Sequence, residues 1–471
     1  MKISISSCIV HCASCIILML YLLVSCKPQS NEPQPTPQDT TVTPTPQPEP
    51  DPVLDSTLQP FSLSACQPIN HVQPMTGLVL WPSHGSINKY KDVIALEYSY
   101  CLPCRVVTGK VGDAIQYDWT YFEDILNDIS SRNHQAVIRF RYEYPGSREV
   151  DGKPGTTAVP QYIKDLEDYK EVGKVTDDGT TFYADWSNAE LQWFTKQFYT
   201  DFAAKYGNDS RIAFLEVGFG HWSEYHIFGT VLNLGHNFPT KEYQNEFLCH
   251  VASVMPIPWL ISIDAADTRY TSIVKTPEVM ALNFGNFDDS FMHEGHEIGS
   301  SDGYNEKSWN AIGQGTRWQR GPSGGEISYY ERKDQREFLN PEGLYDVTWE
   351  QAAAKYHITF MISNDAPGST YGTTDRFKQA SLASGYRFAV LGCRVGKGKT
   401  QLLVTNEGIA PVYRDAYFAI GDTRCSQSLK GLLPGKKVIM EIPVEIDKAE
   451  NLHIISDYIL PTQTIQFNTY L

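Results

Sequence analysis

The sequence lacks the motifs that identify several large enzyme classes. It contains no glycine-rich phosphate-binding loop, no dinucleotide-binding glycine fingerprint and no Gly-x-Ser-x-Gly nucleophile elbow. These absences argue against nucleotide-dependent enzymes and α/β-hydrolases. Positive charge is also scarce, since 39 Lys and Arg residues stand against 55 Asp and Glu residues, a net charge of −16. A chain this acidic is not expected to bind nucleic acid or an anionic membrane surface.

Metal-binding motifs are weak. Cys101-Leu-Pro-Cys104 has CxxC spacing, but a second such pair is absent, so a four-thiolate zinc site is not expected. His293-Glu-Gly-His-Glu297 does not have HExxH spacing, and its Gly and Ser neighbours favour a solvated loop. We therefore predict neither a metal nor another cofactor. In an exported chain, disulfides are the expected use of the remaining cysteines, with Cys393 and Cys425 as one candidate pair.

The N-terminus holds no apolar run long enough to span a bilayer as a mature helix. Lys2 and the short apolar stretch 16–24 are typical of a secretory signal. The stretch ends in Leu23-Val24-Ser25-Cys26, which resembles a bacterial lipobox. This resemblance implies cleavage before Cys26 and lipid attachment to its thiol, so the expected location is the bacterial cell envelope, at the outer membrane or the cell surface. The alternative is an ordinary signal peptide with an incidental cysteine.

The composition changes along the chain and divides it into four parts. Residues 1–25 are the predicted lipoprotein signal peptide, and residues 26–60 form a Pro/Thr/Gln-rich tether that cannot bury a core. Residues 61–383 alternate strand-like and helix-like segments. Residues 384–471 contain short strands separated by Gly, Pro and Asp turns, with no helix between them. We predict a (β/α)8 TIM barrel for the third part and an all-β sandwich for the fourth.

The barrel prediction rests on a count of apolar segments. Helices with an apolar face are expected after Asp118, Ser187, Thr240 and Thr348, where capping residues precede periodic apolar positions. The eight predicted barrel strands are residues 77–81, 93–100, 136–142, 212–217, 259–263, 279–284, 324–327 and 357–363. The predicted sandwich strands are residues 401–405, 417–420, 438–442 and 452–455.

The most informative motif is Val217-Gly-Phe-Gly-His-Trp-Ser-Glu224, at the exit of the fourth predicted strand. Active sites of parallel α/β barrels lie at the C-terminal ends of the strands. A buried carboxylic acid beside Trp222 would have its pKa raised by desolvation, as a general acid requires. We therefore predict Glu224 as the catalytic acid. The alternatives are a surface Glu224 paired with a neighbouring histidine, and Glu216 on the same strand, which would lie in the barrel interior.

A second carboxylate, Glu326, ends the seventh predicted strand in Gly321-Pro-Ser-Gly-Gly-Glu326. The two preceding glycines would let the backbone expose this carboxylate without a clash. Glutamates on strands four and seven point inward from opposite sides of a barrel mouth. A pair about 5.5 Å apart cleaves glycosides with retention, and one about 6.5–9.5 Å apart with inversion. By itself, Glu326 is as readily explained as a turn residue.

Aromatic and polar residues near strand ends are candidate substrate contacts. Each is more often structural than functional, and their common place at strand ends is the reason to consider them. Arg139, Arg141 and Glu143 share one face of the third strand because alternate residues point the same way. Asp289 and Asp365 accompany two of the candidates. The full set is Trp81, Tyr98, Arg139, Arg141, Glu143, Trp222, Asp264, Asn283, Asp288 and Asn364.

These motifs resemble the uncharacterised bacterial lipoproteins with a DUF4832-type barrel. The resemblance covers roughly residues 70–471 and implies a glycoside-hydrolase-like fold. It is carried by residues 77–81, 117–119, 137–141, 206–212, 217–224, 324–326 and 406–411. The fourth-strand exit is also similar to that of β-amylases, in which the final Glu is the acid. Ser223 stands where barrel glycosidases of the large retaining clan usually carry Asn.

Together these features predict a lipid-anchored glycoside hydrolase that acts on an extracellular or periplasmic glycan. Glu224 would be the acid/base and Glu326 the nucleophile or base. The alternative is a non-catalytic surface glycan-binding lipoprotein, because the same aromatic residues and tether would serve it. A structural envelope protein is a third possibility, and it predicts no concave aromatic-lined pocket at the barrel mouth.

Overall fold

The structure is a computed structural model that describes residues 50–470 except residues 84, 147–148, 151–152, 155–156, 178, 295–303 and 364–367. The predicted signal peptide, the lipid site Cys26 and the candidate Asn364 lie outside the described residues. Residues 51–471 form one compact unit. Among the described residues, no helix is long and apolar enough to cross a membrane.

Eight parallel strands close into a barrel, which confirms the predicted TIM-barrel fold. β15 pairs with β2 through Phe360 opposite Gly77, and this pairing closes the ring. In order around the barrel the strands are β2 (Gly77–Leu80), β3 (Leu96–Cys101), β6 (Gln135–Phe140), β11 (Ile212–Glu216), β12 (Trp259–Ser262), β13 (Gly285–Phe291), β14 (Ser323–Ile327) and β15 (Phe360–Ile362).

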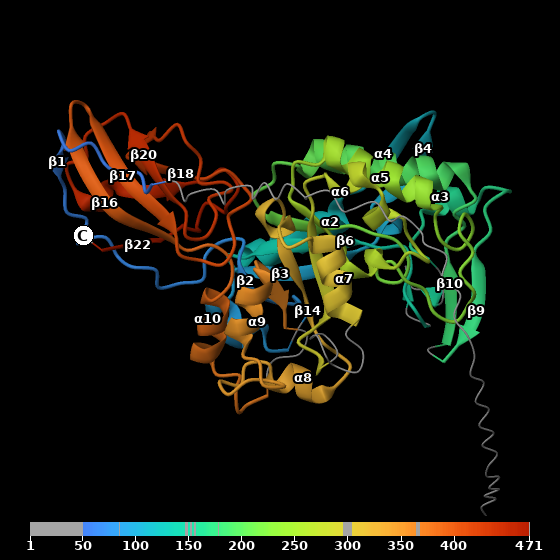
Figure 1. Ribbon diagram of the computed structural model, residues 1–471. Coiled ribbons are helices and arrows are strands. Elements are labelled where there is room, and N and C mark those ends of the chain that lie inside the picture. Colours follow the sequence, from blue (N-terminus) through green and yellow to red (C-terminus); the bar gives the residue numbers. More distant parts are fainter. Residues whose placement is uncertain are drawn as a thin grey trace, which may run out of the picture. The chain divides into compact units, whose positions relative to one another are not determined.

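Helices surround these strands (Figure 1). The structure confirms one predicted helix cap and shifts another by one residue. Thr348 forms a capping box with Gln351, as predicted, whereas the cap of α4 is Asn188 instead of Ser187, because the Asn188 side chain accepts from the Leu191 amide. The helices are α1 (Ile87–Tyr90), α2 (Thr120–Ser131), α3 (Gln161–Lys164), α4 (Ala189–Tyr206), α5 (Lys241–Val254), α6 (Pro277–Met280), α7 (Tyr304–Gly313), α8 (Arg332–Glu337), α9 (Trp349–Tyr356) and α10 (Thr374–Leu382).

The sixth barrel strand is displaced from its predicted position. Residues 279–284 were expected to form it, but Val279 and Met280 belong to α6, which has Pro277 in its first turn. A proline at the start of a helix is favourable because its missing N–H needs no partner there. The strand itself is β13, and Asn283 therefore lies in an exposed turn before the strand, at the end opposite the candidate site.

The C-terminal part forms separate sheets, as predicted. One sheet has the order β1-β16-β17-β20 with β22 beside β16, and the other has the order β19-β18-β21. β1 belongs to the segment assigned to the tether, and it pairs with β16. The strands are β1 (Gln59–Pro60), β16 (Phe388–Gly396), β17 (Lys399–Asn406), β18 (Tyr417–Ile420), β19 (Thr423–Arg424), β20 (Lys437–Ile442), β21 (Leu452–Ile455) and β22 (Phe467–Thr469).

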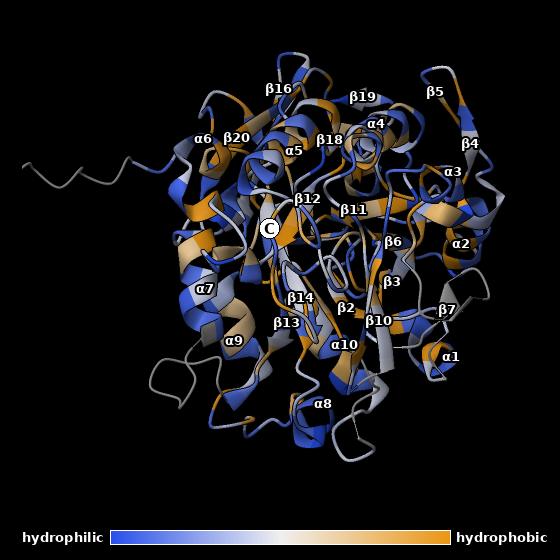
Figure 2. Cartoon of the chain, turned by 90° about the vertical axis from the view of Figure 1, so that its right-hand side faces the viewer, coloured by the Kyte–Doolittle hydropathy of each residue, from blue (hydrophilic) through white to orange (hydrophobic). Residues whose placement is uncertain are grey.

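Three two-stranded hairpins lie outside the barrel sheet. They are β4 (Val107–Val111) with β5 (Ala114–Tyr117), β7 (Glu149–Val150) with β8 (Lys153–Pro154), and β9 (Val172–Thr176) with β10 (Gly179–Tyr183). Hydrophobic residues follow the barrel strands in the middle of Figure 2, whereas α8 is hydrophilic along its length.

The barrel interior is apolar toward the N-terminal ends of its strands. The rings of Phe214 and Phe360 stack with centroids 5.1 Å apart. Phe287 follows toward the C-terminal ends of the strands, and the Arg139 guanidinium lies 4.3 Å from its ring centroid. The interior therefore changes from apolar to charged at the level of Arg139.

Candidate active site

A pocket of about 1290 Å³ contains both predicted catalytic glutamates. Its walls come from the C-terminal ends of the barrel strands and the segments that follow them, as the barrel fold requires. This volume exceeds that of most small-molecule sites and leaves room for an oligosaccharide. The lining residues include Trp81, Tyr100, Arg141, Tyr144, Trp222, Glu224, His226, Phe228, Asp264, Asp267, Arg269, Asp289, Glu326, Tyr329 and Tyr330.

The loop after β11 places Glu224 in this pocket by folding tightly on itself. The His221 amide donates to the His226 carbonyl at 2.8 Å, and the Tyr225 amide donates to the Phe219 carbonyl at 2.8 Å. Trp222, Ser223 and Tyr225 all have positive φ angles, of 52°, 66° and 67°. Such conformations are unfavourable for residues with a side chain, and they cluster at functional sites.

Two glycines make this loop possible. A Cβ at Gly218 would lie 2.0 Å from the Ser223 carbonyl oxygen, and a Cβ at Gly220 would lie 2.4 Å from the His226 carbonyl oxygen. Gly220 also has a φ of +78°, which glycine adopts without cost. The sequence predicts that these two glycines permit a tight exit from the strand. The structure shows why: residues 223 and 226 fold back against them and leave no space for a Cβ.

We expect Gly218→Ala to unfold this loop and to lower the free energy of unfolding by more than about 2 kcal/mol, because the clash is with backbone. Urea denaturation would measure the loss. Gly109→Ala is the matched control, since a Cβ there meets nothing within 4 Å. Equal stability of the two variants would contradict this account of the loop.

Ser223, at the position where the retaining clan carries Asn, makes a structural contact. Its hydroxyl donates to the Phe140 carbonyl at 2.9 Å, and the residue is 3% exposed. This bond ties the loop to the end of β6. In the retaining clan, the Asn at this position binds a sugar hydroxyl. Ser223 does not line the pocket, so its side chain does not take that role here.

Arg139 joins three glutamates at the bottom of the pocket. Its Nε donates to Glu216 Oε2 at 2.8 Å, its Nη1 pairs with Glu224 Oε1, and its Nη2 lies 3.7 Å from Glu326 Oε1. Because a guanidinium is a rigid fork, it can contact a different carboxylate with each of its two terminal nitrogens. Arg139 therefore brings Glu224 and Glu326 to one group at the bottom of the pocket.

The surroundings of Glu224 favour its protonated form. Burial raises the pKa of Glu224 well above its usual range, the Arg139 charge opposes this shift, and Asp289 and Glu326 add to it. A raised pKa favours the protonated form that a general acid needs. Glu216, beneath the pocket, is fully buried and its pKa is also raised, by burial.

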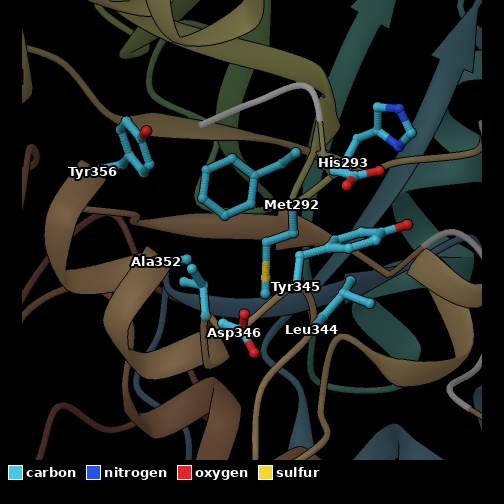
Figure 3. A pocket seen from close by; sticks show the side chains of 10 residues that line it. Met292, His293, Leu344, Tyr345, Asp346, Ala352 and Tyr356 are labelled. Carbon is cyan, nitrogen blue, oxygen red and sulfur yellow. The ribbon is translucent and has the colours of Figure 1, made fainter. Parts of the chain in front are cut away.

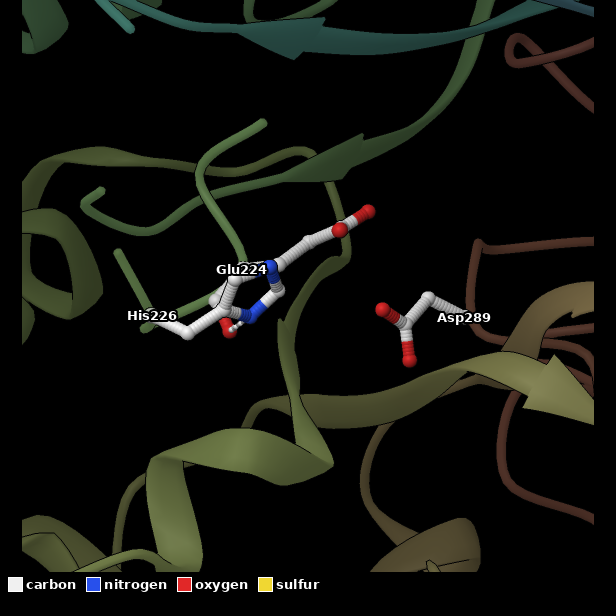
Figure 4. Close-up of side chains that lie close together, drawn as sticks. All are labelled: Glu224, His226 and Asp289. Carbon is white, nitrogen blue, oxygen red and sulfur yellow. Dashed lines mark hydrogen bonds between the residues drawn. The ribbon is translucent and has the colours of Figure 1, made fainter. Parts of the chain in front are cut away.

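His226 and Asp289 lie beside Glu224 (Figure 4), and with Asp264, which contacts His226, they form a polar wall of the pocket. His226 Nδ1 lies 2.9 Å from Asp264 Oδ2. Burial opposes protonation of His226, but this hydrogen bond and the Asp264 charge outweigh it and raise the pKa of His226. Burial and the charge of Asp264 raise the pKa of Asp289 to about 7. One ligand atom each from Glu224, His226 and Asp289 lie within 4.8 Å of one another, a donor set that suits a divalent cation.

The opposite wall is aromatic. Trp81 contacts Tyr98 and Tyr100, with ring centroids 4.7 and 5.1 Å apart. Tyr144 lies edge-on to Trp222 with a centroid distance of 5.7 Å. Flat aromatic faces beside hydrogen-bonding groups suit the alternating apolar and polar faces of a sugar ring.

Six predicted residues line the pocket and five described ones do not. Those in the lining are Trp81, Arg141, Trp222, Asp264, Glu224 and Glu326. Tyr98 and Arg139 are wholly buried beneath it, because each lies one inward position earlier on its strand than a lining residue. Asn283 precedes its strand, as described above.

Glu143 and Asp288 are the other two corrections. β6 ends at Phe140, so alternation no longer applies at Glu143, whose carboxylate accepts from the Ala184 amide at 2.9 Å while burial raises its pKa to about 8. Asp288 is fully buried and accepts from the Ser290 amide. Because Phe287 points inward, Asp289 does so too, and Asp288 points outward.

Sequence reasoning missed the contributions of Tyr100, Tyr144 and His226 to the pocket, and it named Asp289 only as a companion of Asp288. A signal was present for Tyr100, which lies two residues beyond the inward-facing Tyr98 on β3. The inward position of Asp289 depends on β13, which the sequence placed at residues 279–284. No local signal exists for the pairing of His226 with Asp264, because it joins loops from different strands.

A second cavity of about 300 Å³ (Figure 3) shares no lining residue with the pocket that contains Glu224 and Glu326. Met292, Leu344, Ala352 and Tyr356 line it, with His293 and Asp346 among its polar groups. His293 Nδ1 lies 2.9 Å from Asp334 Oδ2. Residues 295–297 of the 293–297 motif lie outside the described residues.

The described cysteines are all in the thiol form. Cys393 and Cys425 are both buried, and the predicted bond between them is absent from the part of the chain that the structure describes. Burial raises the pKa of the Cys393 thiol to about 12. Both side chains belong to the apolar core of the C-terminal sheets.

No protein-family model matches the sequence, and no curated protein matches it. Solved structures similar to this chain include glycoside hydrolases. The catalytic domain of a β-amylase from Paenibacillus polymyxa shares 10% identity over 66% of this chain and 99% of that chain, with a TM-score of 0.41. A family 39 glycoside hydrolase from Bacteroides cellulosilyticus WH2 shares 9% identity over 80% of this chain and 82% of that chain, with a TM-score of 0.37. A GH5_18 protein from Bifidobacterium longum subsp. infantis shares 9% identity over 69% and 83%, with a TM-score of 0.38.

Proposed function

We propose that this protein is a glycoside hydrolase of the bacterial cell envelope, with Glu224 as the general acid and Glu326 as the nucleophile or base. The observation that carries the proposal is the pair of glutamates held at opposite ends of one guanidinium in a large, aromatic-walled pocket. Lipid attachment at Cys26 and membership of the DUF4832-type lipoproteins are part of the proposal and rest on the sequence motifs.

The chemistry follows from the two environments. The raised pKa of Glu224 favours its protonated form, which would transfer the proton to the glycosidic oxygen as the bond to the anomeric carbon breaks. Glu326, beside Arg139, would attack the anomeric carbon directly or take a proton from the attacking water. Protonation of the leaving group by Glu224 leaves its carboxylate ionised next to Arg139, which stabilises the new charge.

The contact between Arg139 and Glu224 also supports the non-catalytic alternative. An arginine paired with the acid favours its ionised form, which would leave a glycan-binding pocket without a proton donor. In that case the pocket would hold the glycan against its aromatic wall without cleaving it.

Incubation of the purified protein with a panel of oligosaccharides would separate the two functions. We expect release of a shorter sugar from at least one member, detected by chromatography, together with binding of that member. Parallel reactions with a chelator test whether the Glu224, His226 and Asp289 donors contribute through a metal ion. Binding without cleavage across the panel would favour the non-catalytic function.

A further inference from the structure

Arg141 is a buried cation in the pocket wall. The residue is 8% exposed, and its Nε and Nη1 atoms make no hydrogen bond with any described residue. It forms no ion pair with a carboxylate in the described parts of the chain. A buried charge with unsatisfied N–H groups is unfavourable, so it normally has a partner.

The immediate neighbours of Arg141 are aromatic. Its guanidinium carbon lies 5.2 Å from the ring centroid of Tyr100 and 4.5 Å from that of Tyr144. Ring faces attract a cation, but they do not satisfy the directional N–H donors of its edge. Burial lowers the pKa of Arg141, and the nearby tyrosines oppose that shift.

The other cationic groups at the pocket each contact a carboxylate. Arg269 pairs with Asp267 at 2.6 Å, and His226 contacts Asp264 at 2.9 Å. Arg139, one inward position below Arg141 on the same segment, contacts Glu216, Glu224 and Glu326. Among the described arginines of the lining, Arg141 is thus the one whose charge the protein leaves for a ligand.

We propose that Arg141 binds the carboxylate of an acidic sugar, so that the natural ligand is a uronate-containing glycan. The proposal rests on the assigned role of this pocket in glycan binding and specifies its substrate class. A guanidinium and a carboxylate match as two parallel hydrogen bonds, which a hydroxyl does not provide. Tyr100 and Tyr144 flank the guanidinium and can contact the same sugar ring.

The position of Arg141 also places the uronate along the bound glycan. β6 is the neighbour of β11 in the barrel, and the loop after β11 carries Glu224. The acidic sugar therefore lies on the aromatic side of Glu224, away from the wall made by Asp264 and Asp289. This arrangement keeps the ligand carboxylate away from the acidic side chains of the opposite wall.

Matched ligand pairs test the proposal. Oligogalacturonates and glucuronate-containing oligosaccharides, each with its carboxyl methyl ester, would be titrated calorimetrically into the full protein. We expect at least one acid form to bind about 10- to 100-fold more tightly than its ester, since a charge-assisted bidentate contact is lost on esterification. The absence of a preference for the acid form in every pair would overturn the proposal.

Arg141→Met should abolish this preference, and Arg141→Lys should retain part of it because a lysine keeps the charge without the fork. Arg424→Met is the control, since Arg424 is exposed and lies over Tyr417 in the C-terminal sheets, and it should retain the full preference. A merely structural Arg141 would make Arg141→Met less stable and weaken acid and ester binding equally, which would overturn the proposal. We expect an unchanged or higher melting temperature instead, because the substitution removes an uncompensated buried charge.

Binding and cleavage distinguish this inference from the proposed function. A uronate oligosaccharide that binds through Arg141 but is never cleaved would leave the inference standing and refute the hydrolase. A neutral glycan that is cleaved, with no acid form preferred, would support the hydrolase and overturn the inference.

Discussion

Glu224→Gln is expected to reduce kcat/KM on a cleavable glycan by about 100- to 10,000-fold while leaving glycan affinity unchanged, because it removes the proton donor and keeps the side-chain shape. Glu326→Gln should cause a loss of similar or greater size. Initial rates and calorimetric binding would measure the two effects. Glu167→Gln is the matched control, since Glu167 is exposed and outside the pocket.

The pH profile gives this prediction a second readout. The pKa of Glu224 is raised, so the wild-type acid stays protonated over a wide range, and the basic limb of the activity profile is set by that pKa. Glutamine does not titrate, so this basic limb should disappear in Glu224→Gln. Aryl glycosides with a good leaving group need little protonation, and they should lose less activity than natural linkages. Full activity of both Gln variants would refute the assignment of the pair.

Arg139→Met should lower the free energy of unfolding by about 3–5 kcal/mol, because it leaves buried carboxylates without their cation. Glu216 is the carboxylate most affected, because it is fully buried and accepts a hydrogen bond from Arg139 Nε at 2.8 Å. Chemical denaturation at neutral pH would measure the loss. Glu216→Gln in the Arg139→Met background should recover part of it, since one unpaired charge is then removed.

The loss should shrink at acid pH. Without Arg139 the pKa of Glu216 rises further above its usual value, so the folded variant binds a proton that the unfolded chain releases near a pKa of about 4.3. Falling pH therefore favours the folded variant, and the difference from wild type is largest at neutral pH. A stability loss that does not change with pH would show that Arg139 acts through packing.

Local sequence was sufficient for the frame of the site. The apolar run 212–217 predicts a buried strand, which the structure has as β11, and the glycines at 218 and 220 predict a sharp exit before Glu224. These inferences succeed because strand formation and the steric demands of a turn depend on neighbouring residues. Gly324 and Gly325 were predicted to expose Glu326, but the structure gives them another reason. A Cβ at Gly324 would meet the Phe360 ring at 2.5 Å, and one at Gly325 would meet the Asp288 carbonyl oxygen at 1.9 Å.

The sixth strand shows where local patterns become ambiguous. Residues 279–284 are as apolar as a buried strand, but Pro277 starts a helical turn there and the polar stretch Gly285–Phe291 forms the strand. Its polar residues are tolerated because they line the pocket or find partners in neighbouring segments, as Asn305 does for Ser290. Burial in the closed barrel determines this strand, and burial is a property of the whole fold.

The sequence by itself determined a barrel, a strand exit that presents Glu224, and a second glutamate three strands later. Only the tertiary structure decided that Arg139 joins the two glutamates, that Asp289 and not Asp288 faces the pocket, and that Arg141 is left without a carboxylate. The physical reason is that these relations join residues from different strands. They depend on strand register, on which face each residue takes and on how each strand ends, and these are fixed only when the barrel closes.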